Sequence, residues 1–422
     1  MDFFRIRGGR PLEGEVGISG AKNAALPVLI SALLVEEGES VVRNVPDLRD
    51  IHTCLKVLGH LGVEYEFDPQ AGEVRLDASR LTGHEAPYDL VKQMRASFLV
   101  MGPLLARRGH ARVSLPGGCA IGPRPVDQHR KAFRTMGASI QDEAGYIDVR
   151  ADPLKGATVF FDRPSHTGTE NVMMGAATAD GVTRIVNAAC DPEIMDLAEA
   201  LNRAGADIDG AGSSEMLIRG VEGLGPLDHT VMPDRLEAGT FLIAGAITRG
   251  DVTVRDARPG HLAIVTDKLR EMGITVEATA EGMRAAAPAR PRATSVTTYP
   301  YPGFPTDLQA AVMALAATAE GTSIVRETVF EDRFLHVAEL GRLGAEIRTV
   351  GNEATIVGVE QLSGASVMAS DIRAGAGLVL ACLAAEGESV VNRVYHVDRG
   401  YEHLEDRLRD LGADITREQD GA

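Results

Sequence analysis

The stretch YEHLEDRLRDLGADI, residues 401–415, contains a short structural unit that recurs along this chain. Its leucines are spaced by three or four residues, which predicts an amphipathic helix. A glycine directly after the last leucine is a usual helix end, because glycine readily takes up the left-handed backbone conformation. The isoleucine that follows favours a strand. The stretch therefore predicts a helix, a glycine turn and a strand, in that order.

The same ending is found six times in the sequence. The fragments are HLGV, TMGA, RAGA, EMGI, RLGA and DLGA, and neighbouring copies are 68 to 75 residues apart. The glycines concerned are Gly62, Gly137, Gly205, Gly273, Gly344 and Gly412. Self-similarity at a fixed interval indicates repeated supersecondary units. The sequence thus predicts six copies of one unit of about 70 residues.

A second helix lies upstream in each unit and is apolar on nearly all sides. The clearest copies are NAALPVLISALL, NVMMGAATA, GTFLIAGAIT, LQAAVMALAATAEG and GAGLVLACLAAEG. A helix without a polar face is buried. Each unit then reads strand, buried helix, strand, amphipathic helix, strand. Because three such units make one domain of ordinary size, we predict two similar α/β domains with the buried helices inside and the sheets facing outward.

Composition agrees with a two-domain globular protein and makes nucleic acid and membranes poor candidate partners. The 422 residues exceed what one core usually supports, and 44% of them are apolar. The formal net charge of −17 disfavours binding to nucleic acid or anionic membranes. MDFFRIRGGR at the N-terminus lacks the apolar segment of a signal peptide, and the run AALPVLISALLV is too short to span a bilayer. We expect a cytoplasmic protein.

The four cysteines are scattered and form no CxxC pair, which argues against a metal site or a disulfide framework. Cys54 and Cys382 lie among helical apolar residues and are expected to be buried. Cys119 follows two glycines in LPGGCAIGPRPVDQH, residues 115–129, and could be a small residue in a turn. The glycines and the nearby Arg124 favour another interpretation, a reactive thiol on a loop that closes over a ligand.

Cations stand at several predicted helix starts. Lys22, followed by Asn23, opens the first buried helix, and Arg373 opens the last. Arg124 precedes Pro125, and Arg399 precedes an amphipathic helix. A cation is disfavoured at a helix N-terminus unless an anion joins it. Any one of them could be a solvated surface charge, but together they predict one site for phosphate or carboxylate.

Other polar residues remain open at this level. Arg95, in VKQMRASFL, lies in or near a helical turn. Asp307, Glu237 and Glu170 could simply be acids in the first turn of a helix, with Thr306 as N-cap for Asp307. Motifs of the forms GxxxxGK[ST], GxGxxG at a helix start and HExxH are absent from the sequence.

Eight segments of the chain resemble the enolpyruvyl transferases, in particular the branch that uses UDP-N-acetylglucosamine. They are GEVGISGAKNAALP, MRAS, LPGGCAIGPRPVDQH, PDRLEAGTF, FPTDLQA, VFEDRF, SDIRA and VDRGYEHLEDRL. The resemblance spans essentially the whole chain. It implies two inside-out α/β barrel-like domains of three repeats each, formed by residues 22–231 and by residues 1–21 with 232–422. It also implies a substrate cleft between these domains.

The resemblance further implies a reaction and its site residues. The enolpyruvyl group of phosphoenolpyruvate would pass to the C3 hydroxyl of UDP-N-acetylglucosamine with release of phosphate, the first committed step of peptidoglycan synthesis. The implied catalytic residues are Cys119, Asp307, Lys22 and Arg399. Phosphoenolpyruvate would contact Lys22, Arg124, Arg399 and Arg373. The acceptor would contact Asn23, Arg95, Arg124, Pro125, Val126, Asp127, Gln128, Asp307 and Val329.

In that scheme Asp307 accepts the hydroxyl proton, while Cys119 protonates or covalently traps the enolpyruvate and reacts with fosfomycin. Further polar cleft residues would be Asp191, Glu193, Glu331, Arg333 and Asp371. The resemblance implies no metal and no organic cofactor, and a monomeric protein. Two departures, PSHTGTEN at residues 164–171 and Cys190 in place of an arginine, bear on the nucleotide.

Three alternatives remain at the level of the sequence. The acceptor could be another nucleotide, or it could be shikimate phosphate, although the shikimate enzyme lacks the cysteine loop. The chain could also be a non-catalytic relative that binds nucleotide sugars. Retention of Cys119, Asp307 and the named cations argues against this last alternative.

Overall fold

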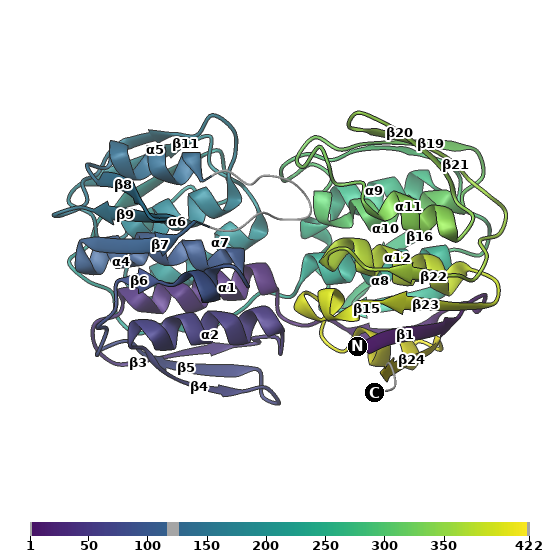
Figure 1. Cartoon of the computed structure of the whole chain (residues 1–422), viewed down its shortest axis with the longest axis horizontal. Coiled ribbons are helices and arrows are strands. Elements are labelled where there is room, and N and C mark those ends of the chain that lie inside the picture. The colour runs from purple at the N-terminus through teal and green to yellow at the C-terminus, as the bar shows by residue number, and fades with distance from the viewer. Residues whose placement is uncertain (1, 116–125, 420–422) are drawn as a thin grey trace. The chain divides into compact units, whose positions relative to one another are not determined.

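The computed structural model describes residues 2–115 and 126–419, which divide into two compact units. Residues 20–115 and 126–232 form one, called here the 20–232 unit. Residues 2–19 and 233–419 form the other, called the 233–419 unit (Figure 1). Each unit has a hydrophobic core of its own.

The 20–232 unit contains twelve strands and seven α-helices among its described residues. The strands are β3 (Glu39–Arg43), β4 (Glu64–Asp68), β5 (Glu73–Asp77), β6 (Glu85–Ala86), β7 (His110–Ser114), β8 (Ser139–Glu143), β9 (Tyr146–Arg150), β10 (Thr158–Phe160), β11 (Val182–Val186), β12 (Asp207–Asp209), β13 (Glu215–Arg219) and β14 (Asp228–Thr230). The helices are α1 (Lys22–Ser31) with η1 (Ala32–Leu34), α2 (Arg49–Leu61), α3 (Tyr88–Val91), η2 (Arg95–Val100) running into α4 (Met101–Arg108), α5 (Asp127–Thr135), α6 (His166–Ala176) and α7 (Pro192–Arg203).

The 233–419 unit has a matching set. Its strands are β1 (Asp2–Arg7), β2 (Glu13–Gly17), β15 (Asp251–Arg255), β16 (Thr275–Ala278), β17 (Gly282–Ala286), β18 (Ser295–Thr297), β19 (Thr322–Arg326), β20 (Glu346–Val350), β21 (Glu353–Val357), β22 (Ser366–Met368), β23 (Glu388–Asn392) and β24 (Asp414–Gln419). Its helices are α8 (Arg235–Ile247), η3 (Pro259–His261), α9 (Ala263–Glu271), η4 (Thr306–Leu308), α10 (Gln309–Ala317), α11 (His336–Arg342), α12 (Ile372–Ala384), η5 (Val394–Arg399) and α13 (Leu404–Asp410).

Each unit is built from three repeats, and every repeat has one four-stranded sheet in the described residues. The orders are β14-β3-β5-β4, β6-β7-β9-β8 and β10-β11-β13-β12 in the 20–232 unit. They are β16-β17-β15-β2, β18-β19-β21-β20 and β22-β23-β1-β24 in the 233–419 unit. In each sheet a parallel pair is extended by antiparallel strands, as β18, β19, β21 and β20 illustrate.

The sheets contain one strand more than the sequence pattern predicted. In five of the six described repeats the chain forms a hairpin after the amphipathic helix, and the second strand of the hairpin pairs antiparallel with one strand of the parallel pair. In the last sheet β1 takes the place of that second strand, between β23 and β24. In the repeat of β20 and β21 the two hairpin strands are joined by a tight turn at Gly351. The second strand is only five residues long, and just two of its side chains are buried. So short a segment carries little alternation from which to predict it.

The six glycines that marked the repeat all end an amphipathic helix. Their φ angles lie between 85° and 107°, in the left-handed region where a side chain is strained. The prediction from the repeated ending is therefore confirmed.

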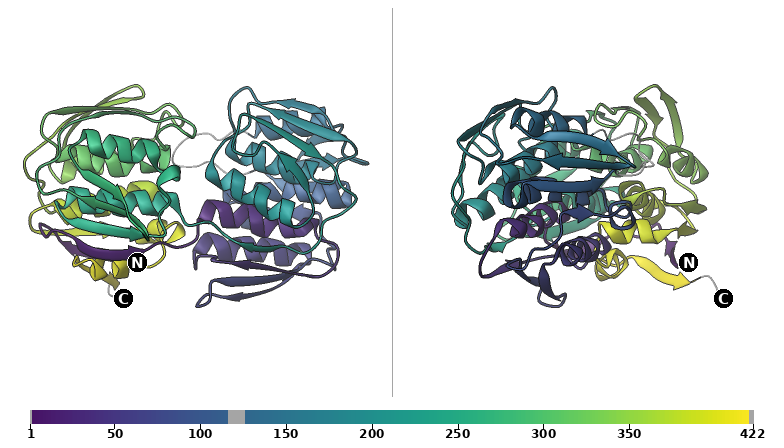
Figure 2. Two further views of the ribbon diagram at one scale, coloured as in Figure 1. Left: turned by 180° about the vertical axis from the view of Figure 1, so that it is seen from behind. Right: turned by 60° about the vertical axis from the view of Figure 1, so that its left-hand side comes forward.

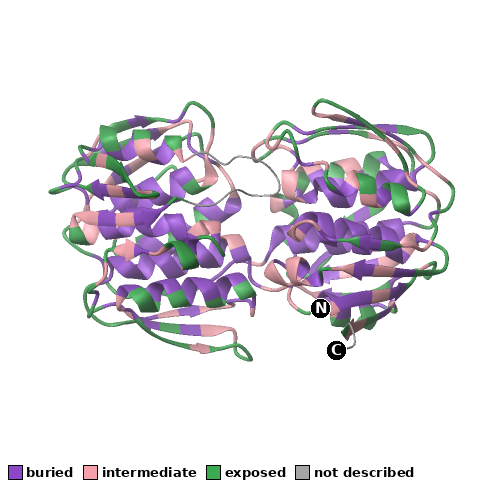
Figure 3. Ribbon diagram, in the orientation of Figure 1, coloured by how far each residue is buried: buried purple, intermediate pink, exposed green. Residues whose placement is uncertain are grey.

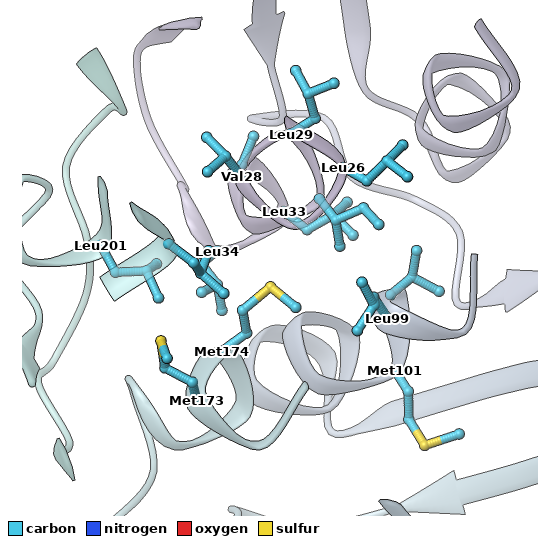
Figure 4. Packing of buried hydrophobic residues seen from close by; sticks show 14 of the residues in the cluster. Leu26, Val28, Leu29, Leu33, Leu34, Leu99, Met101, Met173, Met174 and Leu201 are labelled. Carbon is cyan, nitrogen blue, oxygen red and sulfur yellow. The ribbon is translucent and has the colours of Figure 1, made fainter. Parts of the chain in front are cut away.

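The apolar helices lie at the centre of each unit (Figure 3). Every residue of α8 and of α10 is buried, and α8, α10 and α12 pack against one another. In the 20–232 unit, Val28 of α1 and Leu33 of η1 gather with Met173 and Met174 of α6 in one core (Figure 4). The predicted fold of two α/β units with internal helices is confirmed. Cys54 and Cys382 are fully buried, as expected.

Within the described residues the chain passes between the two units at two places, residues 19–20 and 232–233. At the first crossing, β2 pairs in parallel with β15 in the 233–419 unit, and the next helix, α1, lies in the 20–232 unit. At the second crossing, β14 pairs with β3 in the 20–232 unit, and the next helix, α8, lies in the 233–419 unit. At these crossings Ala21 N–H donates to Met232 O at 2.7 Å, and Asp234 N–H donates to Ser19 O at 2.9 Å. β1 lies between β23 and β24 in the last sheet (Figure 2).

None of the helices in the described residues is both long enough and apolar enough to cross a bilayer.

Candidate functional site

Asp307 lies in η4, immediately before α10, and two arginines hold its carboxylate. Nη1 of Arg333 is 2.7 Å from Oδ1, and Nε of Arg373 is 3.1 Å from Oδ2. Both arginine side chains are buried, whereas the side chain of Asp307 is 24% exposed to solvent. Thr306 does not act as the N-cap considered above, because its hydroxyl bonds to other side chains. The arrangement fixes a reachable carboxylate in one orientation.

Arg373 stands in the first turn of α12, where the side chain of Asp371 caps the helix. Burial lowers the pKa of Arg373, but the nearby Tyr401 and Asp307 outweigh this and raise the pKa above its ordinary value. Nη1 of Arg373 is buried and has no hydrogen-bond acceptor in the described part of the chain. A buried cationic N–H group that has no acceptor within the described residues, at a helix N-terminus, is suited to binding an oxyanion.

Lys22 is the first residue of α1 and is only 7% exposed. Its Nζ lies 3.4 Å from Oδ2 of Asp50, which is itself buried in the first turn of α2. A buried ammonium group needs such a partner, because desolvation of an isolated charge is costly. The pair holds the Lys22 amine beside Asn23, at the helix end predicted to bind an anion.

Arg95 begins η2, and the buried His129 lies close enough to respond to its charge. Burial, followed by repulsion from Arg95, lowers the pKa of His129 to about 4. Nδ1 of His129 is 3.0 Å from the side-chain amide of Asn171, and Nε2 is 3.2 Å from the Thr167 hydroxyl. His129 is therefore neutral and accepts a hydrogen bond from Asn171.

The predicted acceptor residues Val126, Asp127 and Gln128 lie at the start of α5. The side chain of Gln128 bridges to Asp162, accepting from its backbone N–H at 3.1 Å and donating to its carboxylate at 3.1 Å. This bridge connects α5 with the segment that leads into α6, so the PSHTGTEN stretch is held against the predicted nucleotide residues.

His166, Asp191 and Glu193 form a compact cluster at the start of α6 and α7. One ligand atom from each residue lies within 4.8 Å of the others. Burial lowers the pKa of His166, but the surrounding carboxylates reverse this and raise it to about 10. Imidazole and carboxylates can bind a divalent cation. At neutral pH, however, a protonated His166 supplies positive charge by itself.

Glu170 belongs to the same cluster. Its Oε1 is 3.4 Å from Nδ1 of His166, one helical turn away. Glu170 was considered as a first-turn acid, but α6 begins at His166, so Glu170 lies in the second turn and is fully buried. The ion pair with His166, rather than the helix dipole, therefore explains why an acid is buried at this position.

The remaining predicted residues are only partly placed. Cys119, Arg124 and Pro125 lie outside the described residues. Arg399 is the last residue of η5, and Val329 follows β19 with its N–H donating to Glu327 at 2.8 Å. Glu331 is exposed next to this segment. The structure thus brings together Asp307, Arg333 and Arg373 in one unit, and Lys22 with Asp50 in the other.

A family model described as EPSP synthase (3-phosphoshikimate 1-carboxyvinyltransferase) matches residues 6–408 of the chain. The chain belongs to this family of enolpyruvyl transferases. This transferase is 54% identical to UDP-N-acetylglucosamine 1-carboxyvinyltransferase of Myxococcus xanthus, covering 99% of this chain and 100% of that one. It is 52% identical to the enzyme of the same name from Desulfosudis oleivorans, over 99% of both chains.

Solved structures agree with this assignment. The transferase superimposes on the enolpyruvyl transferase NikO from Streptomyces tendae with a TM-score of 0.88, at 26% identity over 100% of this chain and 99% of that one. EPSP synthase from Acinetobacter baumannii matches with a TM-score of 0.77 at 21% identity, over 99% of this chain and 100% of that one, and so shares the fold.

Several residues that hold the site of this enolpyruvyl transferase together are hard to recognise from the sequence. Asp50, His129, Glu327 and Thr306 were assigned no role in the reaction. Asp50 and His129 lie in amphipathic helices, where polar residues are expected on the solvent face and so give no sign of a special role. For Glu327 a signal existed in the alternation of β19, because Glu327 continues the phase of Ser323 and Val325, whose side chains are buried.

Proposed function

We propose that this enzyme transfers the enolpyruvyl group of phosphoenolpyruvate to the C3 hydroxyl of UDP-N-acetylglucosamine and releases phosphate. The observation that carries the proposal is the 51–55% identity to curated UDP-N-acetylglucosamine 1-carboxyvinyltransferases over 99% of the chain. In this role the protein acts in the cytoplasm, as a monomer, at the first committed step of peptidoglycan precursor synthesis. Fosfomycin is then its inhibitor.

The reaction consists of an addition followed by an elimination. The acceptor oxygen bonds to the central carbon of phosphoenolpyruvate while a proton joins the methylene carbon, giving a tetrahedral adduct. Loss of phosphate from the central carbon, and of a proton from the methyl group, restores the double bond. Asp307 takes the hydroxyl proton, and Cys119 protonates or covalently traps the enolpyruvate.

The contacts of Asp307 and Arg373 support these roles. Arg333 and Arg373 together hold the carboxylate of Asp307 in one orientation, as a general base requires. The buried Nη1 of Arg373 is available to an oxygen of phosphoenolpyruvate. Lys22 adds a second cation at the N-terminus of α1, where the helix dipole also favours phosphate.

The test is release of phosphate from phosphoenolpyruvate with UDP-N-acetylglucosamine as acceptor, before and after treatment with fosfomycin. We expect release that depends on the acceptor and is abolished by fosfomycin. Cys119→Ser removes the thiol assigned to the reaction, and activity should fall by about 100-fold or more. Cys382→Ala is the control, because burial raises the pKa of that thiol to about 12 and makes it a poor nucleophile, and Cys382 has no assigned part in binding.

Other outcomes would redirect the proposal. Phosphate release with 3-phosphoshikimate or another nucleotide sugar, but none with UDP-N-acetylglucosamine, would assign a different acceptor. Binding of the nucleotide sugar without turnover would indicate a non-catalytic relative. Full activity of Cys119→Ser that remains sensitive to fosfomycin would remove the thiol from the mechanism.

A further inference from the structure

Glu327 is a carboxylate with no exposed surface, one residue beyond the end of β19. Hydroxyls and backbone N–H groups supply every hydrogen bond to its two oxygens in the described part of the chain. Burying a charge without a cation beside it is costly. An apolar side chain would avoid that cost, so the contacts of Glu327 indicate a role beyond filling space.

One oxygen of Glu327 holds the segment that follows β19. Oε1 accepts hydrogen bonds from the Thr298 hydroxyl at 2.6 Å and from the backbone N–H groups of Val329 and Phe330 at 2.8 and 3.0 Å. These bonds fix the backbone at Val329, the residue proposed to contact the acceptor.

The other oxygen is connected to Asp307 through two side chains. Oε2 accepts from the Thr306 hydroxyl at 2.8 Å, which uses the single proton of that hydroxyl. The oxygen of Thr306 then accepts from Nη1 of Arg333 at 2.9 Å. The same Nη1 lies 2.7 Å from Oδ1 of Asp307.

We propose that Glu327 is the positioning residue of this active site. Through Thr306 it fixes the guanidinium of Arg333, and therefore the direction in which the Asp307 carboxylate points. Through Val329 it fixes the wall on which the acceptor rests. The inference rests on the proposed function for the reaction it serves, but the hydrogen-bond path itself is independent of the substrate.

Glu327→Gln separates the hydrogen bonds of Oε1, which hold the backbone at Val329, from the hydrogen bond of Oε2, which leads through Thr306 to Arg333. Its amide oxygen can still accept from Thr298 and the two backbone N–H groups, which leaves the NH₂ group facing Thr306. The Thr306 hydroxyl can then no longer donate in that direction, and the path to Arg333 is disturbed. Thr306→Val removes the hydroxyl that connects Glu327 to Arg333, while keeping the shape of the side chain.

We expect Glu327→Gln and Thr306→Val each to lower kcat by roughly 10- to 100-fold, the size of effect that a small misplacement of a catalytic group produces. KM for UDP-N-acetylglucosamine should change by less than about threefold, because the branch to Val329 is retained. The double variant should be no slower than the slower single variant, because both substitutions interrupt one path. Thr306→Ser restores the hydroxyl and should recover most of the kcat.

A matched control comes from Thr318, a buried threonine whose hydroxyl donates to Leu315 O at 3.0 Å beyond the end of α10. Thr318→Val loses one hydroxyl, as Thr306→Val does, and should leave kcat unchanged. If Thr306→Val keeps the kcat of the wild type, or if the effects of the two single variants multiply in the double variant, the proposal is overturned.

Crystal structures of Thr306→Val and Thr306→Ser decide the matter without any turnover. We expect the contact between Arg333 Nη1 and Asp307 Oδ1 to be lost in the first and kept in the second. An unchanged contact in both would overturn the positioning role. Lack of turnover in the wild type would refute the proposed function alone, and failure of Glu327→Gln to fold would leave the two threonine variants to decide.

Discussion

His129 is a single buried residue through which pH acts on stability. Its pKa is lowered to about 4, first by burial and then by Arg95. In the unfolded chain it would bind a proton near its ordinary value of about 6.5. Between these values the folded state binds fewer protons, so stability is present above pH 6.5 and is lost as the pH falls towards 4.

We therefore predict that His129→Gln makes stability less sensitive to acid. The wild type should lose about 3 kcal/mol at this site between pH 6.5 and 4, and the glutamine variant should not. Urea unfolding at pH 7 and at pH 4.5 measures the difference. His336, whose pKa burial also lowers to about 4, should retain its own contribution in both proteins. Parallel pH profiles for the variant and the wild type would contradict the prediction.

Asp307 shows how far single residues could be predicted from the sequence. Its position in a first turn was visible, and so was its place in the motif FPTDLQA. Its partners Arg333 and Arg373 are 26 and 66 residues away, and such contacts leave no local signal. The family resemblance implied that Asp307, Arg333 and Arg373 belong to the site. Only the structure shows that the two arginines hold the carboxylate of Asp307.

At the scale of the elements, local signals were sufficient for the helices. Helix ends follow from glycine conformation, and burial follows from an all-apolar surface, so both could be read from a few neighbouring residues. The second hairpin strand, such as β21, could not be predicted, because its identity depends on pairing with β19 rather than on its own sequence. Pairing partners that are distant in the chain lie beyond a local pattern.

Helix α11 offers a direct test of the glycine ends. Gly344, which follows this helix, has a φ of +90° and no atom near an added Cβ, so Gly344→Ala introduces backbone strain alone. We expect a loss of about 1 kcal/mol in the free energy of unfolding. Gly341 lies inside α11 with an ordinary φ and equally open surroundings.

Gly341→Ala is therefore the matched control and should stabilise the protein by up to about 1 kcal/mol, because alanine favours the helix. Chemical denaturation of both variants measures the two effects. Shifts of equal size and sign would show that the left-handed backbone at Gly344 is not what ends the helix.

At the scale of the whole molecule, the order of segments along the chain differs from their order in the sheets. β1 lies in the interior of the last sheet, and β2 forms the edge of the sheet of β15. The repeat pattern could not predict this, because residues 1–21 precede the first buried helix and belong to no complete copy. Only the resemblance implied a domain composed of both chain ends.

We predict that the two units differ in their ability to fold alone. A fragment of residues 20–232 contains all twelve strands of its sheets and should unfold cooperatively. A fragment of residues 233–422 lacks β1 and β2, so it should remain unfolded or aggregate. Co-expression with a peptide of residues 1–19 should restore a soluble, folded complex.

Circular dichroism and thermal unfolding of the purified fragments test this prediction. A peptide in which Phe4 is replaced by alanine is the control, because Phe4 of β1 is fully buried and its loss should weaken the complex. A cooperative transition of residues 233–422 without the peptide would contradict the prediction.

The interior position of β1 also has a consequence for synthesis of the protein. The strand leaves the ribosome long before its partners β23 and β24, which lie more than 380 residues later in the chain. At the usual rate of roughly 5–20 residues per second, β1 waits from about 20 s to more than a minute before it can pair. Meanwhile the 20–232 unit can fold, and an unpaired apolar strand remains tethered to it. During synthesis β1 is therefore exposed to chaperones and proteases for longer than a strand whose partners lie close by in the sequence.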